Sequence, residues 1–564
     1  MTKRLLTFLL FINLTGCPYT EGCQALPEEP TTATIPTDPA TDPVVPVTDV
    51  DAGAVDAAVD ASGTPGAIDF GPTPTGGPAL STMSCPELAM PIAAATTTLY
   101  VDAAGTGAED GTKASPFRTV AKAFTAATSG AVVHVAAGTY KENLSVPNKD
   151  LVVFGGFAPG FGARTNACAT ILEAADVSKA VLTATDDVKS FGIEGVTVQK
   201  GARGLDVKGD SSLQASFTIA RCVFAENGTT SEIGGGAALD SINARVFHSV
   251  FRDNRASKGA ALSAGGDVTL TADQNLFLHN LGYSDHGGGL YIDAKYSKIT
   301  RNTFRANATA VTTKGGWGGA IIVYSNSLTE RARADFSFNV FTENVAGIGA
   351  AVFIDDGATA TMSHDLVYRN RAYPENGFVR GAAIYVDGTG YPGGGSTFNA
   401  EYLTVVNNAL DDTGAPSKST LGGNIFVEGF SKATITSSTF WNNGDRGFYV
   451  APDNELTVTN TIAATTCTST DGQGLVTAPA TICKVGAGVF EPNAIYFGDE
   501  STDDYHEKST AGRFSKGAWI YDTVTSPAID KGDPLVNVGN EPMPNGGRAN
   551  LGAFARTSEA SMSP

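Results

Sequence analysis

An acidic residue recurs at the end of a repeated phrase, and it is the first candidate for chemistry in this chain. The phrase GAAIYVDG, residues 381–388, returns as GGLYIDA from Gly288, GAAVFIDDG from Gly349 and GGNIFVEG from Gly422. If each copy forms a strand, successive side chains point to opposite faces. The outward face then carries an acidic column, Asp293, Asp355, Asp387 and Glu428, with Tyr324 in one copy, and an aromatic column, Tyr291, Phe353, Tyr385 and Phe426.

Two interpretations of these columns stay open. Stacked strands lie about 4.8 Å apart, so neighbouring carboxylates repel unless one is protonated, a cation bridges them or the turns separate them. In the functional interpretation, the carboxylates bind Ca²⁺ or sugar hydroxyls, and sugar rings lie on the solvent-facing aromatic column. In the structural interpretation, the columns are surface ladders whose Asp residues bond to the following turn.

The alternate positions of the same strands, whose side chains point to the other face, are apolar and are predicted to form the core. Its two rows are Leu239, Leu262, Leu290, Ile321, Val352, Ile384 and Ile425, and Ile292, Val323, Ile354, Val386 and Val427.

A second repeat indicates stacked coils. Phe followed three positions later by Asn occurs at Phe224, Phe251, Phe277 and Phe304, which are 27, 26 and 27 residues apart, and the intervals between later copies are 37, 26, 38 and 35 residues. Two residues before the apolar position stand Asn275, Asn302, Asn339 and Asp365. Asn accepts left-handed backbone geometry, and stacked amides can bond from coil to coil, so this column predicts a turn ladder. A nearly constant unit of this length is typical of a solenoid.

These repeated motifs resemble those of a known group of proteins. Phe-x-x-Asn together with GGAI, residues 318–321, is similar to the repeats of chlamydial polymorphic outer-membrane proteins and, more widely, to the pectin-lyase-like right-handed parallel β-helix superfamily. The resemblance covers roughly residues 97–466 and implies an all-β, right-handed parallel β-helix of about ten or more coils. It implies function only broadly, because the superfamily includes lyases, hydrolases, epimerases and adhesins. Lyases of this fold use a basic residue with Ca²⁺, and Arg301 or Lys298 would be the base here.

Composition divides the chain into segments. Residues 1–16, ending before Cys17 in MTKRLLTFLLFINLTGC, resemble a lipoprotein signal peptide, which makes Cys17 the expected lipidated residue. Residues 17–80 are a Pro/Thr/Asp-rich segment expected to be a disordered tether. Residues 81–150 form the N-terminal cap and first coils, with a helix predicted from Ser115 and Pro116 that buries Phe117, Val120, Ala121 and Phe124. The repeats fill 151–466, and 467–564 form a C-terminal segment.

The cysteines suggest an exported protein with disulfides. Cys467 and Cys483 would close a short loop and are the expected pair. Cys85 pairs with Cys168 or with Cys222 in the alternatives that remain open, and Cys23 is unassigned.

The net charge and the predicted export signal limit the classes of function expected of this chain. A net charge of −20 and a pI near 4.7 exclude a nucleic-acid binder. We expect a lipoprotein of a Gram-negative outer membrane or cell surface, anchored in the membrane by its lipid, that presents the β-helix for adhesion or glycan binding without catalysis. Its partner would be a polysaccharide or the surface of a host or neighbouring cell. The alternatives are an exported Ca²⁺-assisted polysaccharide lyase and a structural envelope protein.

Overall fold

The structure of this protein is a computed structural model. The described residues are 85–86, 88, 97–185, 190–209, 215–309, 316–325, 331–373, 379–410, 420–421, 424–443, 447–463, 467–471, 474–477 and 483–564. The predicted signal peptide, Cys17, Cys23 and the predicted tether lie outside these residues. No helix in the described ranges is long and apolar enough to cross a membrane.

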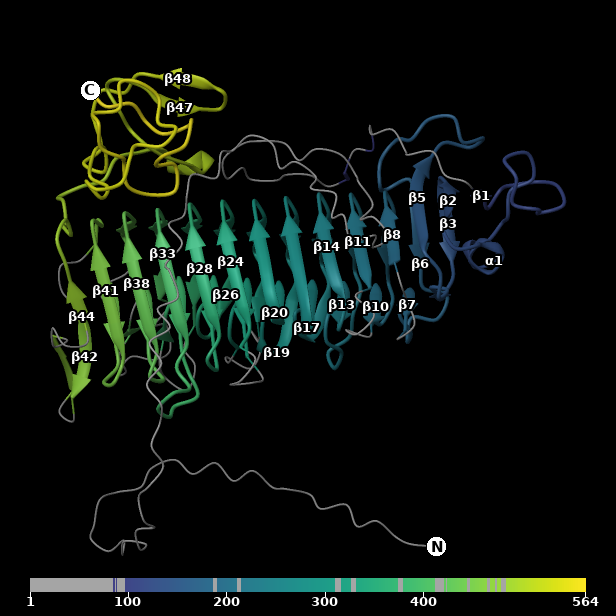
Figure 1. Ribbon diagram of the computed structural model, residues 1–564, viewed down its shortest axis with the longest axis horizontal. Helices are drawn as coiled ribbons and strands as arrows, with labels where there is room; N and C mark the ends of the chain where they lie inside the picture. Colours follow the sequence, from purple (N-terminus) through teal and green to yellow (C-terminus); the bar gives the residue numbers. More distant parts are fainter. Residues whose placement is uncertain are drawn as a thin grey trace, which may run out of the picture. The chain divides into compact units, whose positions relative to one another are not determined.

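The described chain winds through parallel strands that stack coil upon coil (Figure 1). One coil runs from β18 (Leu276–Leu278) through β19 (Leu281–His286) to β20 (Leu290–Thr300) before the next coil begins at β21 (Thr303–Arg305). Strands at equivalent positions of successive coils pair in parallel. This is the expected right-handed parallel β-helix.

The strands fall into four stacks. The first, in the largest sheet, contains β1 (Thr98–Val101), β2 (Ala131–Ala136), β5 (Leu151–Phe157), β8 (Ser190–Glu194), β11 (Ser216–Ala220), β14 (Asn243–Phe247), the later parts of β17 (Leu262–Asp273) and β20, β24 (Arg333–Ser337), β28 (Thr359–Ser363), β33 (Thr397–Glu401), β38 (Lys432–Thr436), β41 (Glu455–Thr459) and β44 (Cys483–Val485). The second, in the same sheet, contains β4 (Leu144–Ser145), β7 (Leu182–Ala184), β10 (Leu205–Lys208), β13 (Ala237–Asp240), the earlier parts of β17 and β20, β23 (Ile321–Val323), β27 (Val352–Ile354), β32 (Ile384–Val386), β37 (Ile425–Val427), β40 (Phe448–Val450) and β42 (Thr468–Asp471), which also pairs with β43 (Gly474–Thr477).

The other two stacks are separate sheets. The third is an 11-stranded sheet of β3 (Gly138–Lys141), β6 (Thr170–Glu173), β9 (Thr197–Gln199), β12 (Val223–Ala225), β15 (Val250–Arg252), β18, β21, β25 (Val340–Thr342), β29 (Leu366–Tyr368), β34 (Thr404–Val406) and β39 (Thr439–Trp441). The fourth contains β16 (Arg255–Lys258), β19, β22 (Ala308–Thr309), β26 (Val345–Ala346), β30 (Arg371–Ala372) and β35 (Ala409–Leu410), and β31 (Val379–Arg380) pairs with β36 (Thr420–Leu421) nearby. Eleven stacked strands confirm the expectation of about ten or more coils.

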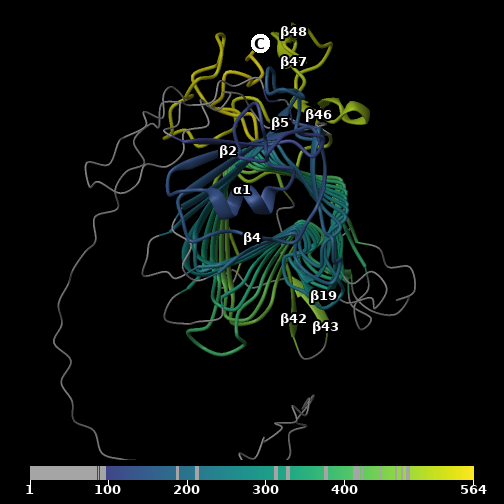
Figure 2. The same cartoon turned by 90° about the vertical axis from the view of Figure 1, so that its right-hand side faces the viewer.

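A short helix, α1 (Val120–Ala126), lies across the first end of the solenoid, as the sequence predicts (Figure 2). It begins later than predicted because Phe117 pairs with Val101 as an isolated bridge and Thr119 is the N-cap. The carboxylate of Glu142 accepts hydrogen bonds from the first N–H groups of the helix. The buried face contains Val120, Ala123 and Phe124, whereas Ala121 is exposed, which corrects the predicted face.

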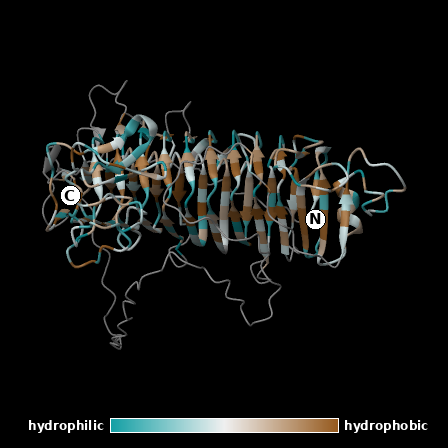
Figure 3. Ribbon diagram, turned by 90° about the horizontal axis from the view of Figure 1, so that it is seen from above, coloured by the Kyte–Doolittle hydropathy of each residue, from teal (hydrophilic) through white to brown (hydrophobic). Residues whose placement is uncertain are grey.

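The core of the solenoid consists of the predicted apolar rows. Figure 3 shows apolar positions repeating at matching places on neighbouring strands. The rows pair in register: for example, Leu262 pairs with Leu290, and Leu290 pairs with Ile321. Leu239 is buried but pairs with Ala264, and Ala237 pairs with Leu262, so Leu239 belongs to the second row rather than the first.

Two amide ladders run along the turns on either side of the third stack. The predicted ladder is confirmed, because Asn275, Asn302, Asn339 and Asp365 are joined by bonds of 2.9, 3.1 and 2.9 Å. The Asn residues of the Phe-x-x-Asn motifs form a second, longer ladder with bonds of 2.8–3.1 Å from Asn227 to Asn443. Phe rings of the same motifs stack with centroids 4.5–5.2 Å apart.

The left-handed backbone of these turns lies one residue earlier than predicted. Positive φ angles occur at Gln274 and Arg301, which precede ladder residues, while the Asn residues themselves are not left-handed. Each Asn instead uses its amide to bond to the next coil and to a backbone carbonyl of the previous coil, as Asn302 does with Asn339 and Ala272.

The C-terminal segment continues the solenoid and then packs against its side. β44 pairs with β41, and Cys483 bonds to Cys467 as expected. Cys85 bonds to Cys168, while Cys222 is a buried free thiol. Beyond this, a segment with β45 (Phe497–Asp499), η2 (Glu500–Thr502), β46 (Asp504–Glu507), β47 (Arg513–Ser515) and β48 (Ala518–Ile520) covers the outer face of the third stack. The Tyr505 ring, for example, lies 4.5 Å from the Tyr368 ring.

Removing one amide from the longer ladder is expected to destabilise the solenoid. Asn307 donates to Phe277 and Asn344 and accepts from Asn280, all in buried surroundings. Unsatisfied buried groups cost about 1–3 kcal/mol each, so Asn307→Ala should lower the free energy of unfolding by about 3 kcal/mol. Thermal unfolding followed by circular dichroism measures the change. Asn540→Ala, at an exposed position, is the matched control, and equal melting temperatures for the two variants would contradict the ladder's role.

The one acid in the shorter ladder makes stability depend on pH. Burial raises the pKa of Asp365 to about 7 from an ordinary value of 3.8. The contribution of the protonated carboxyl is therefore complete below 3.8 and is lost as the pH rises through about 7. Asp365→Asn keeps the acceptor oxygen without the charge, so its melting temperature should exceed that of the wild type more at about pH 8 than at about pH 5. A difference that does not change with pH would show that Asp365 does not titrate in this range.

Candidate functional site

A pocket of about 670 Å³ lies on the side of the solenoid, over the second stack of strands. We call it the flank pocket. Its lining residues are His286, Trp317, Tyr324, Ile348, Phe353, Asp355, Asp356, Arg380, Tyr385, Asp387, Gly388 and Glu428. It therefore brings together half of the predicted aromatic column and three of the four acidic-column residues.

A row of residues that sequence reasoning missed forms one wall of the pocket. Successive coils place His286, Trp317, Ile348 and Arg380 in parallel bridges to one another, and we call this row the cover column. A glycine with positive φ follows each member, for instance Gly318 at 66°. This backbone geometry turns the chain sharply, so that the cover column lies over the outer face of the strand that follows. The repeated residue–Gly pair before each strand was the available sequence signal.

The aromatic column points away from the core as predicted, but its predicted exposure to solvent is wrong. Tyr291, Phe353, Tyr385 and Phe426 are 8, 2, 1 and 2% exposed. With Ile322 and Tyr449 they form a small apolar cluster outside the main core, against which Trp317, Tyr324 and Ile348 pack. The cover column accounts for this burial. Tyr385 and Phe426 also cover one face of each other's ring, because the two rings stack with centroids 4.7 Å apart.

The aromatic side chains that are half-buried at the pocket are Trp317 and Tyr324. The Trp317 ring packs edge-on against Phe353 and His286, with centroid distances of 5.7 and 5.0 Å. Its Nε1 is buried without a hydrogen-bond partner among the described residues. Tyr291 and Phe426, two of the predicted sugar-binding residues, do not line the pocket.

Within the acidic column, Asp355 and Asp387 have matching local geometry. The Oδ1 atom of Asp355 accepts from the backbone N–H of Asp356 at 2.8 Å, and that of Asp387 accepts from Gly388 at 2.7 Å. The structural interpretation, in which these Asp residues bond to the following turn, thus describes one oxygen of each. Asp293, the remaining aspartate of the column, is half-buried and does not line the pocket.

Two carboxyl groups of the pocket, those of Asp355 and Asp387, have raised pKa values. Burial, together with the charges of Asp356 and Asp387, raises the pKa of Asp355 to about 8. Burial and the charge of Glu428 raise the pKa of Asp387 to about 7. The predicted repulsion between stacked carboxylates is therefore relieved in part by protonation.

Arg380 ties one end of the row together. Its guanidinium lies 3.3 Å from Glu428 and 3.4 Å from the hydroxyl of Tyr385, which also donates to Glu428. Burial alone would lower the pKa of Arg380, but Tyr385 and Glu428 raise it above its ordinary value. Arg380 is therefore a fixed positive charge, and near neutral pH it cannot act as a proton acceptor.

Three of the predicted metal-binding residues line the pocket without forming a metal-binding group, and the predicted base Arg301 lies elsewhere. Among the described residues, no group of three or more His, Cys, Asp or Glu side chains lies close enough to hold a metal ion. The acidic column is a row rather than a cage, and Ca²⁺ binding stays a prediction. Arg301 lies at another turn of the coil, where it bonds to Asp273 at 2.7 and 2.9 Å.

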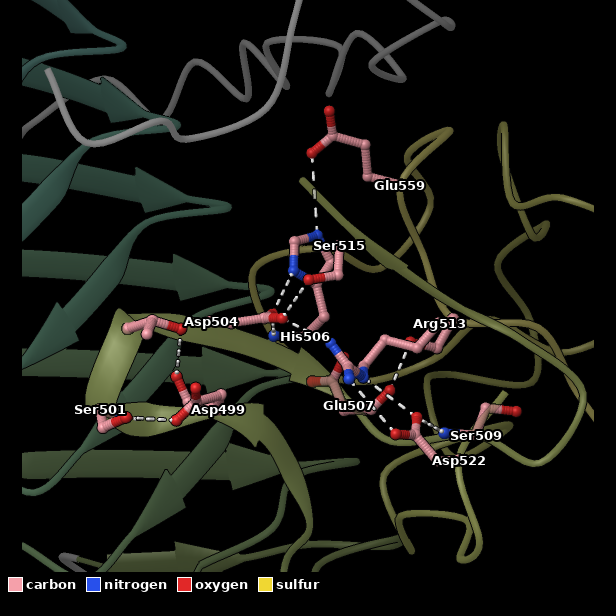
Figure 4. A network of polar contacts seen from close by, with 12 residues as sticks. Asp499, Ser501, Asp504, His506, Glu507, Ser509, Arg513, Ser515, Asp522 and Glu559 are labelled. Carbon is pink, nitrogen blue, oxygen red and sulfur yellow. Dashed lines mark hydrogen bonds and ion pairs between the residues drawn. The ribbon is translucent and has the colours of Figure 1, made fainter. Parts of the chain in front are cut away.

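A separate polar network lies in the C-terminal segment (Figure 4). Asp504 bonds to His506 at 2.9 Å and to Ser515 at 2.7 Å, and Arg513 joins Asp504 to Asp522. Burial would raise the pKa of Asp504, but His506, Ser515 and Arg513 lower it to about 2. Ser515 donates to the carboxylate rather than to the imidazole, so this arrangement does not activate a nucleophile.

The fold and the comparisons define the class of protein. Residues 180–391 match the family described as "Right handed beta helix region". Together with the stacked parallel sheets, this match confirms the right-handed parallel β-helix. Residues 103–146 match a family described as a protein of unknown function, and residues 490–532 match one described as "Disaggregatase related".

Three solved structures illustrate what the chain is similar to. Pectate lyase Pel9A has 12% identity and a TM-score of 0.41 over 82% of this chain and 97% of its own. A rhamnogalacturonan lyase has 14% identity and a TM-score of 0.30 over 76% and 96%. The pectin methylesterase from carrot has 13% identity and a TM-score of 0.26 over 59% and 88%. No curated protein sequence matches the chain. Similarities this weak do not bear on activity.

The raised pKa of Asp355 predicts a titration that infrared spectroscopy can detect. With a pKa of about 8, this carboxyl is mostly protonated at neutral pH and ionises as the pH rises further. The wild-type spectrum minus that of Asp355→Asn should contain a carboxylic-acid band at about pH 6 that disappears by about pH 10. Asp453→Asn, at an exposed turn, is the matched control. A carboxylate band at pH 6 in the Asp355 difference would contradict the assignment.

Proposed function

We propose that this protein is a non-catalytic cell-surface lipoprotein whose β-helix binds a glycan in the flank pocket and thereby adheres to a polysaccharide. In this proposal the chain is anchored in the outer membrane or at the cell surface through a lipid on Cys17. The observation that supports glycan binding is the pocket itself, where the half-buried Trp317 ring lies beside a row of carboxyl groups.

The chemistry of the pocket suits a saccharide. A sugar ring has apolar C–H faces and a rim of hydroxyl donors, and the pocket offers an aromatic wall and carboxyl acceptors to match. Its volume of about 670 Å³ is in the usual range for small-ligand sites. The buried aromatic column stiffens the floor, because Phe353 and Tyr385 are locked by their neighbours. A rigid floor reduces the ordering cost of binding.

A polysaccharide lyase is the second candidate, since Arg380 places a basic residue beside the carboxyl row. Two observations weigh against it. The guanidinium is engaged by Glu428 and Tyr385, which raise its pKa, so it is a poor base. The described carboxyl groups also do not converge as a metal-binding set of three. A structural envelope role is the third candidate, and it requires neither binding nor turnover.

The test of the proposal is glycan binding by the chain carrying Cys17→Ser, which prevents lipidation and keeps the protein in solution. The chain is screened on a glycan array with and without Ca²⁺, and hits are measured by calorimetry while unsaturated products and reducing ends are followed. Trp317→Ala should weaken binding by roughly tenfold or more, the equivalent of about 1.4 kcal/mol for one lost aromatic wall. Trp519→Ala, which removes a half-buried indole from the C-terminal segment, is the matched control.

Three outcomes separate the candidates. Binding without turnover that Trp317→Ala weakens and Trp519→Ala does not supports the proposal. Turnover that is lost in Asp387→Asn overturns the proposal in favour of the polysaccharide lyase. Absence of both binding and turnover overturns it in favour of a structural role.

A further inference from the structure

We propose that the saccharide bound in the flank pocket carries free amino groups, so that the ligand is a cationic, glucosamine-type glycan rather than a neutral or acidic one. This inference rests on the proposed function and specifies its ligand. It stands on the open carboxyl oxygens and the charge balance of the pocket.

The carboxyl groups of the pocket keep oxygens available for a ligand. Asp355 lines the pocket although only 5% of it is exposed, and its Oδ1 is occupied by the following N–H group. Its Oδ2 has no hydrogen-bond partner among the described residues, and the same holds for Oδ2 of Asp387 and Oε2 of Glu428. A nearly buried carboxyl oxygen without a hydrogen-bond partner is costly whether it is ionised or protonated, unless a ligand supplies the partner.

Acidic side chains outnumber basic ones in the lining of the pocket. Asp355, Asp356, Asp387 and Glu428 line it, against a single arginine that is already bonded to Glu428. His286 adds no charge near neutral pH, because burial and the nearby Lys258 lower its pKa to about 4. An acidic sugar would bring further negative charge into this row and would be repelled. A ligand with a positive charge would be attracted.

Protonation of Asp355 and Asp387 is the response expected of carboxyl groups that lack a cation. Their raised pKa values reflect burial and mutual repulsion, and a bound cation would relieve the same repulsion. An ammonium group has three N–H donors, which suits open carboxyl oxygens spaced one coil apart. A metal ion needs several oxygens around one point, and the described residues provide no group of three. The aromatic ring of Trp317 adds a cation–π surface at the same place, whereas Lys258 already lies over the Tyr324 ring, 6.0 Å from its centroid.

The experiment compares two short oligosaccharides that differ only in the amino group. Fully deacetylated glucosamine oligomers and N-acetylated oligomers of equal length are titrated into the Cys17→Ser chain at physiological salt, with and without Ca²⁺. The deacetylated oligomer should bind at least roughly tenfold more tightly, as expected for one charge-assisted hydrogen-bond set. Asp387→Asn keeps the acceptor for the Gly388 N–H and removes the charge, so it should abolish most of this preference. Asp453→Asn is the matched control that should keep it.

The acidic chain as a whole attracts cations, so a linear polyamine of similar charge is titrated in parallel. Equal binding of the deacetylated oligomer to the wild type, Asp387→Asn and Trp317→Ala would reveal non-specific attraction and overturn the inference. Tighter binding of N-acetylated or acidic oligomers, still weakened by Trp317→Ala, would overturn the inference while the proposed function stands. A requirement for Ca²⁺ would also overturn it, in favour of a bridging metal. Failure of every glycan to bind would instead remove the proposed function itself.

Discussion

In-register stacking of coils is the constraint on which the rest of this structure depends. Backbone pairing places each residue of one coil beside its equivalent in the next, and the buried amide ladders hold that register at both turns of the third stack. A shift of one residue in the pairing between coils would leave every ladder amide without its hydrogen-bond partners and would move the apolar rows out of the core. Stacked Phe rings reinforce the same alignment. Like residues are therefore neighbours throughout the solenoid.

Stacking of like residues stabilises amides and aromatic rings but creates a conflict where the repeated residue is acidic. Along most of the solenoid this conflict is avoided by variation, as where Gly265 and Tyr324 occupy the acidic position. In the flank pocket three acidic residues follow one another, and the repulsion is relieved by protons and by Arg380. A cluster that is unfavourable for the fold by itself, at the wall of a pocket, is the kind of site where function is expected.

The sequence allowed most of the fold to be predicted and only part of the site. The apolar rows, the Asn275–Asp365 ladder and the cap helix followed from periodicity, because each coil repeats the same local chemistry. Leu239 was assigned to the wrong row because alignment of a Gly-rich copy fixes the register only to within two residues. The acidic side chains of the pocket were found from the repeat. His286, Trp317 and Arg380 were missed because their types vary from coil to coil, so no column of like residues marked them.

The sequence by itself determined that the chain forms a solenoid and which strand positions face the core. It also determined that the aromatic and acidic columns point away from the core, since strand alternation and a constant repeat are local properties. Only the tertiary structure decided that the aromatic column is buried, because the cover column reaches it through glycine turns at positive φ and belongs partly to neighbouring coils. It likewise decided that Arg380 meets Glu428, 48 residues away in the chain, and that the C-terminal segment packs on the third stack. Contacts between segments this far apart depend on loop paths, which residue patterns do not encode.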